Sequence, residues 1–352
     1  PIAEIDTDGS TVITKHPGTG GAVSAGTVTA QLLYEVGGVR YLNPDVVARL
    51  DTIALNDEGD DRVRISGVRG EPAPATTKVS IVGMEGYRNT MTFVLTGLDI
   101  ERKSRLAADA LWTSLGGRDA FSRTEERLIR ADAGDPATNE AAFAYLRVAV
   151  LDPDRDKVDR AFSNAAVELA LANYPGLTFT SPPGRAAPSV VFWPATIPSH
   201  LVPQIVTVDG EQTEIAATPP RDGTGGVEPI HEPAFPPVEG PTVAVPIGRL
   251  VGTRSGDKGG DANLGVWARN DEVYRWLGGY LTVARLRELL PETGDLTIER
   301  HVLANLRAIN FVLKGFLDEG VASSMKLDPQ AKTLGEYLRA KVVEVPEPLV
   351  PV

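Results

Sequence analysis

Cysteine is absent from the 352 residues, and its absence excludes several kinds of chemistry. A chain without thiols forms no disulfide bond, gives no thiolate ligand to a metal ion and has no cysteine nucleophile. Histidine is scarce too, with four residues, and His200, His231 and His301 stand far apart without the spacing of metal ligands. A catalytic role would therefore fall mainly to carboxylates, hydroxyls, lysines and the fourth histidine, His16.

Long hydrophobic runs are also missing, since no stretch approaches the roughly 20 apolar residues of a membrane-spanning helix. No signal peptide is visible, so we expect a cytoplasmic protein without a membrane partner. The chain begins at Pro1 rather than at methionine, and the sequence leaves open whether this is the native N-terminus.

Basic residues are outnumbered, with 35 against 47 acidic ones, which gives a net charge of -12. Nucleic-acid binding depends on Lys and Arg that neutralise phosphates, so we expect no nucleic-acid partner. Net charge describes the distant field alone, and a local pocket for an anion remains compatible with it.

Proline and glycine concentrate in the segment 217–241, which holds seven prolines and four glycines in 25 residues. Such a composition sustains neither a helix nor a central strand, so we interpret the segment as an extended linker. It divides the chain into a larger domain, 1–216, and a smaller one, 242–352.

Apolar periodicity predicts both helices and strands on each side of this linker. Before it, the alternation of the two indicates a larger domain of the α/β or α+β class; after it, the order β-β-α-β-β-α indicates a small α+β sandwich. The predicted helices are 24–36, 98–115, 155–172, 271–277, 282–291 and 333–343, and the predicted strands are 76–82, 90–95, 142–150, 190–193, 201–208, 243–253, 262–268, 296–303 and 307–313.

A first glycine-rich stretch, 14–21, runs into the helix that Ser24 is expected to cap. Backbone N–H groups at a helix N-terminus suit a phosphate or carboxylate. The alternative is a turn that needs glycine only for its backbone angles. In the first interpretation Lys15 supplies charge and His16 transfers protons, and the stretch adds four further substrate-binding candidates, Gly18, Thr19, Gly20 and Gly21.

A second stretch, 252–265, interleaves five glycines with charged and polar residues. Arg254 and Lys258 are candidates to hold an anion, and Asp257 to act as an acid or base, in one version as the base for a Ser255 nucleophile. The alternative is a solvated hairpin whose charges neutralise one another. A polar segment longer than the usual 2–5 residues of a hairpin loop favours a ligand site. Gly259, Gly260 and Asn263 complete the substrate-binding candidates here, while Asp257 and Asp261 are the candidates for Mg²⁺, the one cofactor considered.

A third stretch, 305–311, places Arg307 and Asn310 among apolar residues, where a polar side chain needs a partner. Both are candidates to bind substrate, and a place at a sheet edge or on its solvent face is the alternative.

These stretches together resemble the acyclic terpene utilisation (AtuA-like) family. The similarity covers nearly the whole chain and is carried by the segments 14–21, 31–35, 41–46, 252–265 and 305–312. The resemblance implies a ferredoxin-like C-terminal domain and a place in the bacterial breakdown of acyclic terpenoids such as citronellol and geraniol, which proceeds through acyl-CoA thioesters. Family members typically carry a further segment before the position of Pro1, so we expect a homo-oligomer or a complex with that segment or a separate subunit.

Three functional hypotheses follow. The leading one is an enzyme subunit that binds an acyl-CoA or other small anionic substrate, with hydratase or lyase chemistry, in a pocket formed jointly by 15–21 and 254–263. The second is a non-catalytic assembly protein of a catabolic complex. The third is Mg²⁺-assisted hydrolysis of a phosphate ester.

Overall fold

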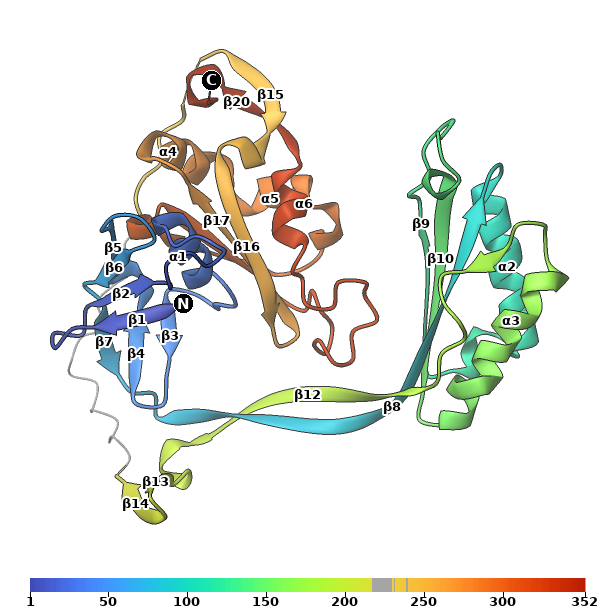
Figure 1. The fold of residues 1–352 in the computed structure, drawn as a ribbon, viewed down its shortest axis with the longest axis horizontal. Coiled ribbons are helices and arrows are strands. Elements are labelled where there is room, and N and C mark those ends of the chain that lie inside the picture. The colour runs from blue at the N-terminus through green and yellow to red at the C-terminus, as the bar shows by residue number, and fades with distance from the viewer. Residues whose placement is uncertain (217–229, 231, 239, 352) are drawn as a thin grey trace. The chain divides into compact units, whose positions relative to one another are not determined.

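A computed structural model describes residues 1–216, 230, 232–238 and 240–351, and most of the expected linker lies outside these ranges. Contacts between residues divide the chain into two compact units (Figure 1). Unit 1 combines Pro1–Ile81 with Pro194–Val352, and unit 2 is Val82–Trp193. The expected first domain, 1–216, is therefore shared between the two units, because its first 81 residues pack with the C-terminal part of the chain.

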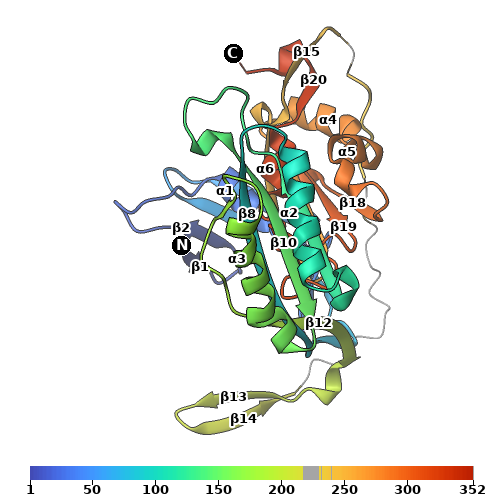
Figure 2. The same cartoon turned by 90° about the vertical axis from the view of Figure 1, so that its right-hand side faces the viewer.

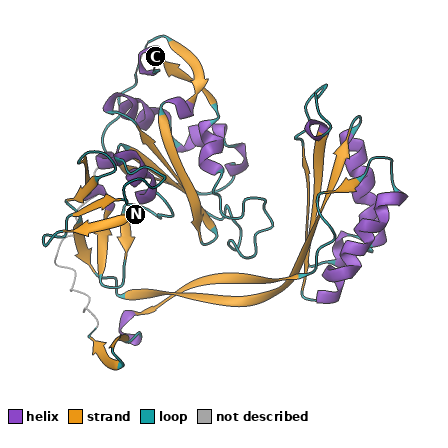
Figure 3. Ribbon diagram, viewed as in Figure 1, coloured by secondary structure: helices purple, strands orange, loops and turns teal. Residues whose placement is uncertain are grey.

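The C-terminal part of unit 1 contains one four-stranded sheet with helices against it (Figures 1 and 3). The strand order is β16-β17-β19-β18 and every pair is antiparallel, which confirms the expected ferredoxin-like α+β sandwich. Its strands are β16 (Val251–Lys258), β17 (Asp261–Ala268), β18 (Ile298–Leu303) and β19 (Ala308–Leu313), and its helices are α4 (Asp271–Tyr280), α5 (Val283–Leu289) and α6 (Leu334–Arg339).

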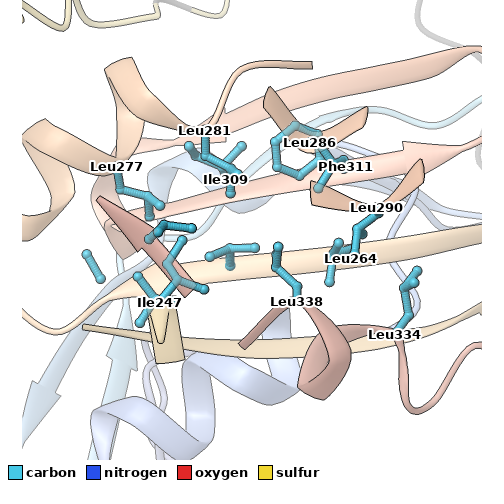
Figure 4. Close-up of a cluster of buried hydrophobic side chains, with 14 of the residues drawn as sticks. Ile247, Leu264, Leu277, Leu281, Leu286, Leu290, Ile309, Phe311, Leu334 and Leu338 are labelled. Atoms are coloured by element: carbon cyan, nitrogen blue, oxygen red, sulfur yellow. The ribbon is translucent and has the colours of Figure 1, made fainter. Parts of the chain in front are cut away.

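The core of this sandwich lies between the sheet and its three helices. Side chains alternate along a strand, so Leu264 of β17 and Phe311 of β19 face the same layer. Both are fully buried, together with Leu277 of α4 and Leu338 of α6 (Figure 4). Phe235, within the expected linker, packs its ring edge-on to Tyr274, with 5.4 Å between the centroids.

The opposite face of the same sheet is covered by the N-terminal part of the chain. Helix α1 (Ala25–Leu32) and the residues after it form a second core, in which Leu33 and Val36 pack with Leu303 and Ala308. Through this face, residues 1–81 and the C-terminal sheet belong to one compact unit.

Short strands account for most of the remaining structure of unit 1, and the apolar pattern predicts none of those before residue 73. Runs of three to five residues are too short for periodicity to identify. They are β1 (Ile2–Ile5), β2 (Thr11–Thr14), β5 (Ala54–Asp57) and β6 (Val63–Ser66) in one sheet, β3 (Arg40–Leu42), β4 (Val46–Arg49) and β7 (Arg69–Pro72) in another, and the pairs β13 (Gln204–Val208) with β14 (Glu211–Ile215) and β15 (Thr242–Pro246) with β20 (Val342–Pro346).

Unit 2 is built around the strands β8 and β10, whose register places Phe93 opposite Leu146. Two helices lie side by side over one face of this sheet (Figure 2) and bury Leu111 and Phe162 there. The elements within unit 2 are α2 (Ile100–Ser114), β9 (Arg123–Ile129), β10 (Phe143–Asp152), α3 (Phe162–Ala172) and β11 (Thr178–Phe179). The strands β8 (Thr76–Thr96) and β12 (Ala187–Pro198) belong to it in part, since residues 76–81 and 194–198 are counted with unit 1.

The prediction of two strands at 76–82 and 90–95 is wrong, because a single strand, β8, covers both. Gly83 and Gly86 interrupt the apolar alternation between them, and the backbone stays extended nevertheless. Within the described ranges, no helix combines the length and the apolar character needed to cross a membrane.

Candidate functional site

The second glycine-rich stretch is a β-hairpin, which corrects the prediction of a long loop between 254 and 263. Strands β16 and β17 pair along the whole stretch, and Lys258 lies opposite Asp261. Only Gly259 and Gly260 remain for the turn. Gly259 has a left-handed backbone (φ 67°), and a Cβ on Gly260 would lie 2.3 Å from the Asp318 carbonyl oxygen. Gly259 is thus required by the turn and Gly260 by the close approach of Asp318, and a two-residue turn does not favour a ligand site by its length.

One face of the hairpin points toward α6 and carries Ser255. The buried Ser255 hydroxyl accepts a hydrogen bond from Gly335 N–H (2.9 Å) and donates one to the Lys332 carbonyl oxygen (3.3 Å). These bonds fasten the start of α6 to the edge strand β16. Asp257 accepts from Lys332 Nζ at 3.2 Å, and no described hydrogen bond joins it to Ser255. The arrangement expected for an activated serine is absent from the described contacts.

The other face of the sheet carries two buried amides, Asn263 on β17 and Asn310 on the neighbouring strand β19. Asn263 accepts from Glu35 N–H (2.8 Å) and donates to the Leu33 carbonyl oxygen (2.7 Å) and to Asn310 Oδ1 (2.8 Å). Asn310 in turn donates to the Val36 carbonyl oxygen at 3.1 Å. The two amides therefore hold the backbone after α1, although the sequence suggested that they bind substrate.

This backbone is held in an unusual conformation. Glu35 has a left-handed φ of 57°, which costs free energy in a non-glycine residue and is maintained where the surroundings fix it. Gly256 lets the segment approach, since a Cβ there would lie 2.8 Å from the Tyr34 ring and 2.9 Å from Glu35 Cγ. Tyr34 and Glu35 are thereby pressed against β16.

Lys332 lies at the centre of a charged cluster, which we call the Lys332 cluster: Tyr34, Glu35, Asp257 and Lys332. Its ammonium group donates to Glu35 Oε1 (2.6 Å), to Asp257 Oδ1 (3.2 Å) and to the Tyr34 hydroxyl. Burial alone would lower the pKa of Lys332, but the two carboxylates and the hydroxyl raise it well above its ordinary value. Burial would likewise raise the pKa of Glu35, and the hydrogen bonds from Lys332 and Tyr34 outweigh this and lower it.

Arg254 and Lys258 lie on the face of β16 that packs against Tyr34 and Glu35, whereas Asp257 lies on the opposite face and reaches the cluster at the edge of the strand. The Arg254 guanidinium lies 4.2 Å from the centre of the Tyr34 ring, and Lys258 Nζ lies 5.9 Å from that of Tyr41. Neither forms an ion pair with any described residue. Desolvation by the surrounding protein lowers the pKa of Lys258, and the nearby charge of Lys78 lowers it further.

The charges of the hairpin do not cancel one another. Asp257 pairs with Lys332, and Asp261 pairs with Lys314 at 3.2 Å. The two carboxylates also fall on opposite faces, since residues 257 and 261 are opposite Ala262 and Lys258 in the register. They are therefore poorly placed to share a magnesium ion, and among the described residues no group of three His, Asp or Glu side chains could hold a metal.

The first glycine-rich stretch forms a separate turn before α1. Lys15 Nζ contacts the Thr19 carbonyl oxygen (2.8 Å) and Asp61 (3.1 Å). Gly18 and Gly21 have left-handed backbones (φ 72° and 85°), as the turn interpretation requires, while Gly20 has open space around it. Ser24 caps the helix as predicted, in a capping box with Thr27.

His16 is exposed at the N-terminal end of α1, whereas the Lys332 cluster lies beyond its C-terminal end. The helix has 8 residues and is therefore about 12 Å long. The described hydrogen bonds of the turn lead to Asp61 and not to the hairpin. A pocket shared by the two glycine-rich stretches stays a prediction that these contacts do not support.

Arg307 lies outside the cluster, although it is only three residues before Asn310. It directly precedes β19 with a left-handed φ of 49°, and its exposed guanidinium pairs with Asp271 at the start of α4. Arg307 thus belongs to a surface ion pair.

Tyr34, Glu35 and Lys332 were not among the candidates from the sequence. Tyr34 and Glu35 stand in a segment that carries the family resemblance, and this was the one signal that could have identified them. Lys332 has no local signal, because its partner Glu35 is 297 positions away.

The fold and this cluster define a two-part protein, in which a ferredoxin-like sheet carries charged groups on the hairpin β16–β17 and an N-terminal region packs on that sheet. Residues 1–208 match the model of the acyclic terpene utilisation family protein AtuA, and 245–344 match the AtuA ferredoxin-like domain. The chain belongs to the AtuA family. Comparison with curated proteins and with solved structures gives no match.

Proposed function

We propose that this chain acts in the breakdown of acyclic terpenoids by binding a small anionic acyl substrate, of the acyl-CoA type, around Tyr34. The observation that carries the proposal is the pair Arg254 and Lys258, two cations without acidic partners among the described residues of a chain with net charge -12. Arginine and lysine in such a position bind phosphate or carboxylate groups.

The Lys332 cluster supplies the groups for proton transfer next to a thioester carbonyl. Lys258, which forms no ion pair with any described residue, is the cation that can stabilise an oxyanion on the carbonyl oxygen, because the three N–H groups of the Lys332 ammonium already bind Glu35, Asp257 and Tyr34. Asp257, 3.2 Å from that ammonium, is the carboxylate that moves the proton at the adjacent carbon. This assignment suits a hydratase or lyase.

Calorimetric titration with a branched acyl-CoA tests the binding step. Arg254→Ala and Lys258→Ala should each weaken binding about tenfold or more, the equivalent of one lost charged hydrogen bond. Arg62→Ala is the control, because Arg62 is an exposed arginine already paired with Glu4. Unchanged affinity in both hairpin variants would remove the basis of the proposal.

A different substitution tests the proton transfer. Asp257→Asn should keep the acyl-CoA affinity within a few-fold and abolish turnover, because the amide keeps the shape of the carboxylate without its basicity. Retained turnover in this variant would assign the proton transfer to another group.

One observation favours the alternative, a non-catalytic assembly protein. Every residue of β13 and β14 is exposed, including Ile205, Val208 and Ile215, and an isolated two-stranded hairpin is marginally stable in water. In this case Ile205→Ser with Val208→Ser should release a stoichiometric partner or dissociate an oligomer, measured by light scattering. Acyl-CoA would then fail to bind the unaltered chain.

A further inference from the structure

A cavity of about 640 Å³ lies in unit 1 where β15, the residues around Gly248, the end of α6 and the C-terminal residues meet. Arg249, Arg269 and Arg339 line it, beside apolar groups that include Val245, Pro246 and Val350. Its volume falls within the range of small-molecule sites, roughly 300–1,000 Å³.

The fold brings two of these arginines together at the open end of the hairpin. Val251 pairs with Ala268 as the last rung of β16 and β17. Arg249 stands two residues before Val251, in the short turn Ile247–Arg249, and Arg269 follows Ala268 directly. The turn Gly259–Gly260 closes the other end of the hairpin, so this cavity and the Lys258 end of β16 are separated by the length of the strand, about 23 Å for eight residues.

The third arginine is fixed in place by the protein. Arg339 binds both carboxylate oxygens of Glu336 (2.8 and 3.0 Å) and the Gly248 carbonyl oxygen (3.3 Å). A Cβ at Gly248 would lie 2.8 Å from Arg339 Cβ, so only glycine allows this approach. The Nε atom of Arg339 is buried and has no hydrogen-bond partner in the described part of the chain.

The charges that remain decide what the cavity can bind. Glu336 neutralises Arg339, whereas Arg249 and Arg269 form neither an ion pair nor a side-chain hydrogen bond with any described residue. No acidic residue is among those that line the cavity. Two unneutralised positive charges match a phosphate monoester, whose charge at neutral pH is about -1.5 to -2.

We propose that this cavity binds a small phosphate monoester, with the phosphate on Arg249 and Arg269 and the organic group against Val245 and Val350. Guanidinium groups match phosphate oxygens in pairs, and the apolar wall favours an organic ester over inorganic phosphate. The site shares no residue with the surface around Tyr34, so either proposal can fail without the other.

Calorimetric titration of the full chain with phenyl phosphate tests the proposal, with benzoate as the matched carboxylate. We expect phenyl phosphate to bind and benzoate to bind more weakly. Arg249→Ala and Arg269→Ala should each reduce the affinity for phenyl phosphate about tenfold or more, and Arg269→Lys should reduce it less because it keeps the charge.

Two controls locate the site. Arg62→Ala should bind phenyl phosphate as the unaltered chain does, and circular dichroism should show that both cavity variants are folded. Failure of the unaltered chain to bind phenyl phosphate would overturn the proposal, as would equal binding of benzoate. Loss of affinity in Arg254→Ala but in neither cavity variant would place the phosphate near Tyr34 instead and would also overturn it.

Discussion

The ammonium group of Lys332 contacts two carboxylates and a hydroxyl at one place in the fold. Without it, Glu35 and Asp257 would be neighbouring negative charges at the edge of β16. We predict that Lys332→Met lowers the free energy of unfolding by about 1 kcal/mol at neutral pH, the value for a partly exposed network. The expected change is small because the Lys332 and Glu35 side chains are 33% and 37% exposed, and solvent screens the attraction between their charges.

The effect of this substitution depends on pH in a defined direction. The lowered pKa of Glu35 means that its contribution is complete above the ordinary value of 4.5 and is lost as the pH falls through the lowered one. The raised pKa of Lys332 means that its contribution is complete below 10.5 and is lost above that. Urea unfolding should therefore show a larger difference from the unaltered chain at about pH 7 than at about pH 3, where part of the contribution of Glu35 is lost.

Lys341→Met is the control for this prediction. Lys341 Nζ binds the Tyr337 hydroxyl at 2.7 Å, and no described carboxylate pairs with it. Its substitution should change stability equally at both pH values. A Lys332→Met difference that persisted undiminished in acid would contradict the assigned ion pairs.

Substitution of Asn263 distinguishes a structural role of its amide from a role in ligand binding. Replacement by leucine would leave Glu35 N–H, the Leu33 carbonyl and Asn310 Oδ1 buried without this partner. Since each such group costs about 1–3 kcal/mol, we expect Asn263→Leu to lower the free energy of unfolding by about 2–4 kcal/mol. Asn43→Ala, at a half-buried site where the amide makes one long hydrogen bond of 3.5 Å, should change it by less than about 0.5 kcal/mol. Unchanged stability with lost substrate binding would return Asn263 to the ligand site.

Among the elements, the contact of α1 with the hairpin depends on small residues in the strands. A Cβ at Gly265 would lie 2.6 Å from Leu33 Cβ, at the end of α1. We predict that Gly265→Ala costs about 1–3 kcal/mol, as overpacking of a close contact does, and raises hydrogen exchange in α1. Gly134→Ala is the control, since no atom lies within 4 Å of a Cβ there. Equal stability of the two variants would mean that α1 can move without cost.

The longer elements could be predicted from the sequence because periodicity needs length to be recognised. The helix expected at 98–115 is α2 (Ile100–Ser114), and the strand expected at 142–150 is β10 (Phe143–Asp152). The strands on either side of the second glycine-rich stretch were predicted, but the extension of β16 through Lys258 was missed, because Arg254, Asp257 and Lys258 give this part of the strand the composition of a loop. Their side chains find partners or solvent on the two faces of an edge strand, and this depends on tertiary packing that local composition does not contain.

The residues of the candidate site also fall into two groups, those that the sequence indicated and those that it did not. Arg254, Asp257 and Lys258 attract attention because they stand close together in one short segment, and they do lie beside the cluster. Lys332 and Glu35 meet only because α6 and α1 pack on opposite faces of one sheet, across 297 positions of sequence. Pairings of that kind follow from topology, which a single sequence does not reveal.

In the molecule as a whole, each unit has a hydrophobic core of its own. Leu146 is fully buried in unit 2 and Leu264 in unit 1, in clusters that share no residue. Leucine-to-alanine changes in such cores cost about 2–5 kcal/mol. We predict that Leu146→Ala increases hydrogen exchange within 82–193 alone, and that Leu264→Ala increases it in both 1–81 and 194–352.

The two variants serve as controls for each other, because the residue type and burial are the same and only the core differs. The response of 1–81 to Leu264→Ala is the decisive part, since those residues precede the substitution by more than 180 positions. If hydrogen exchange rose in 194–352 but not in 1–81, the two segments would not form one cooperative unit, which would contradict the prediction. That result would restore the boundary at 217–241 as the division between two separately folded domains, because α1 would then be a layer that the C-terminal sheet does not need.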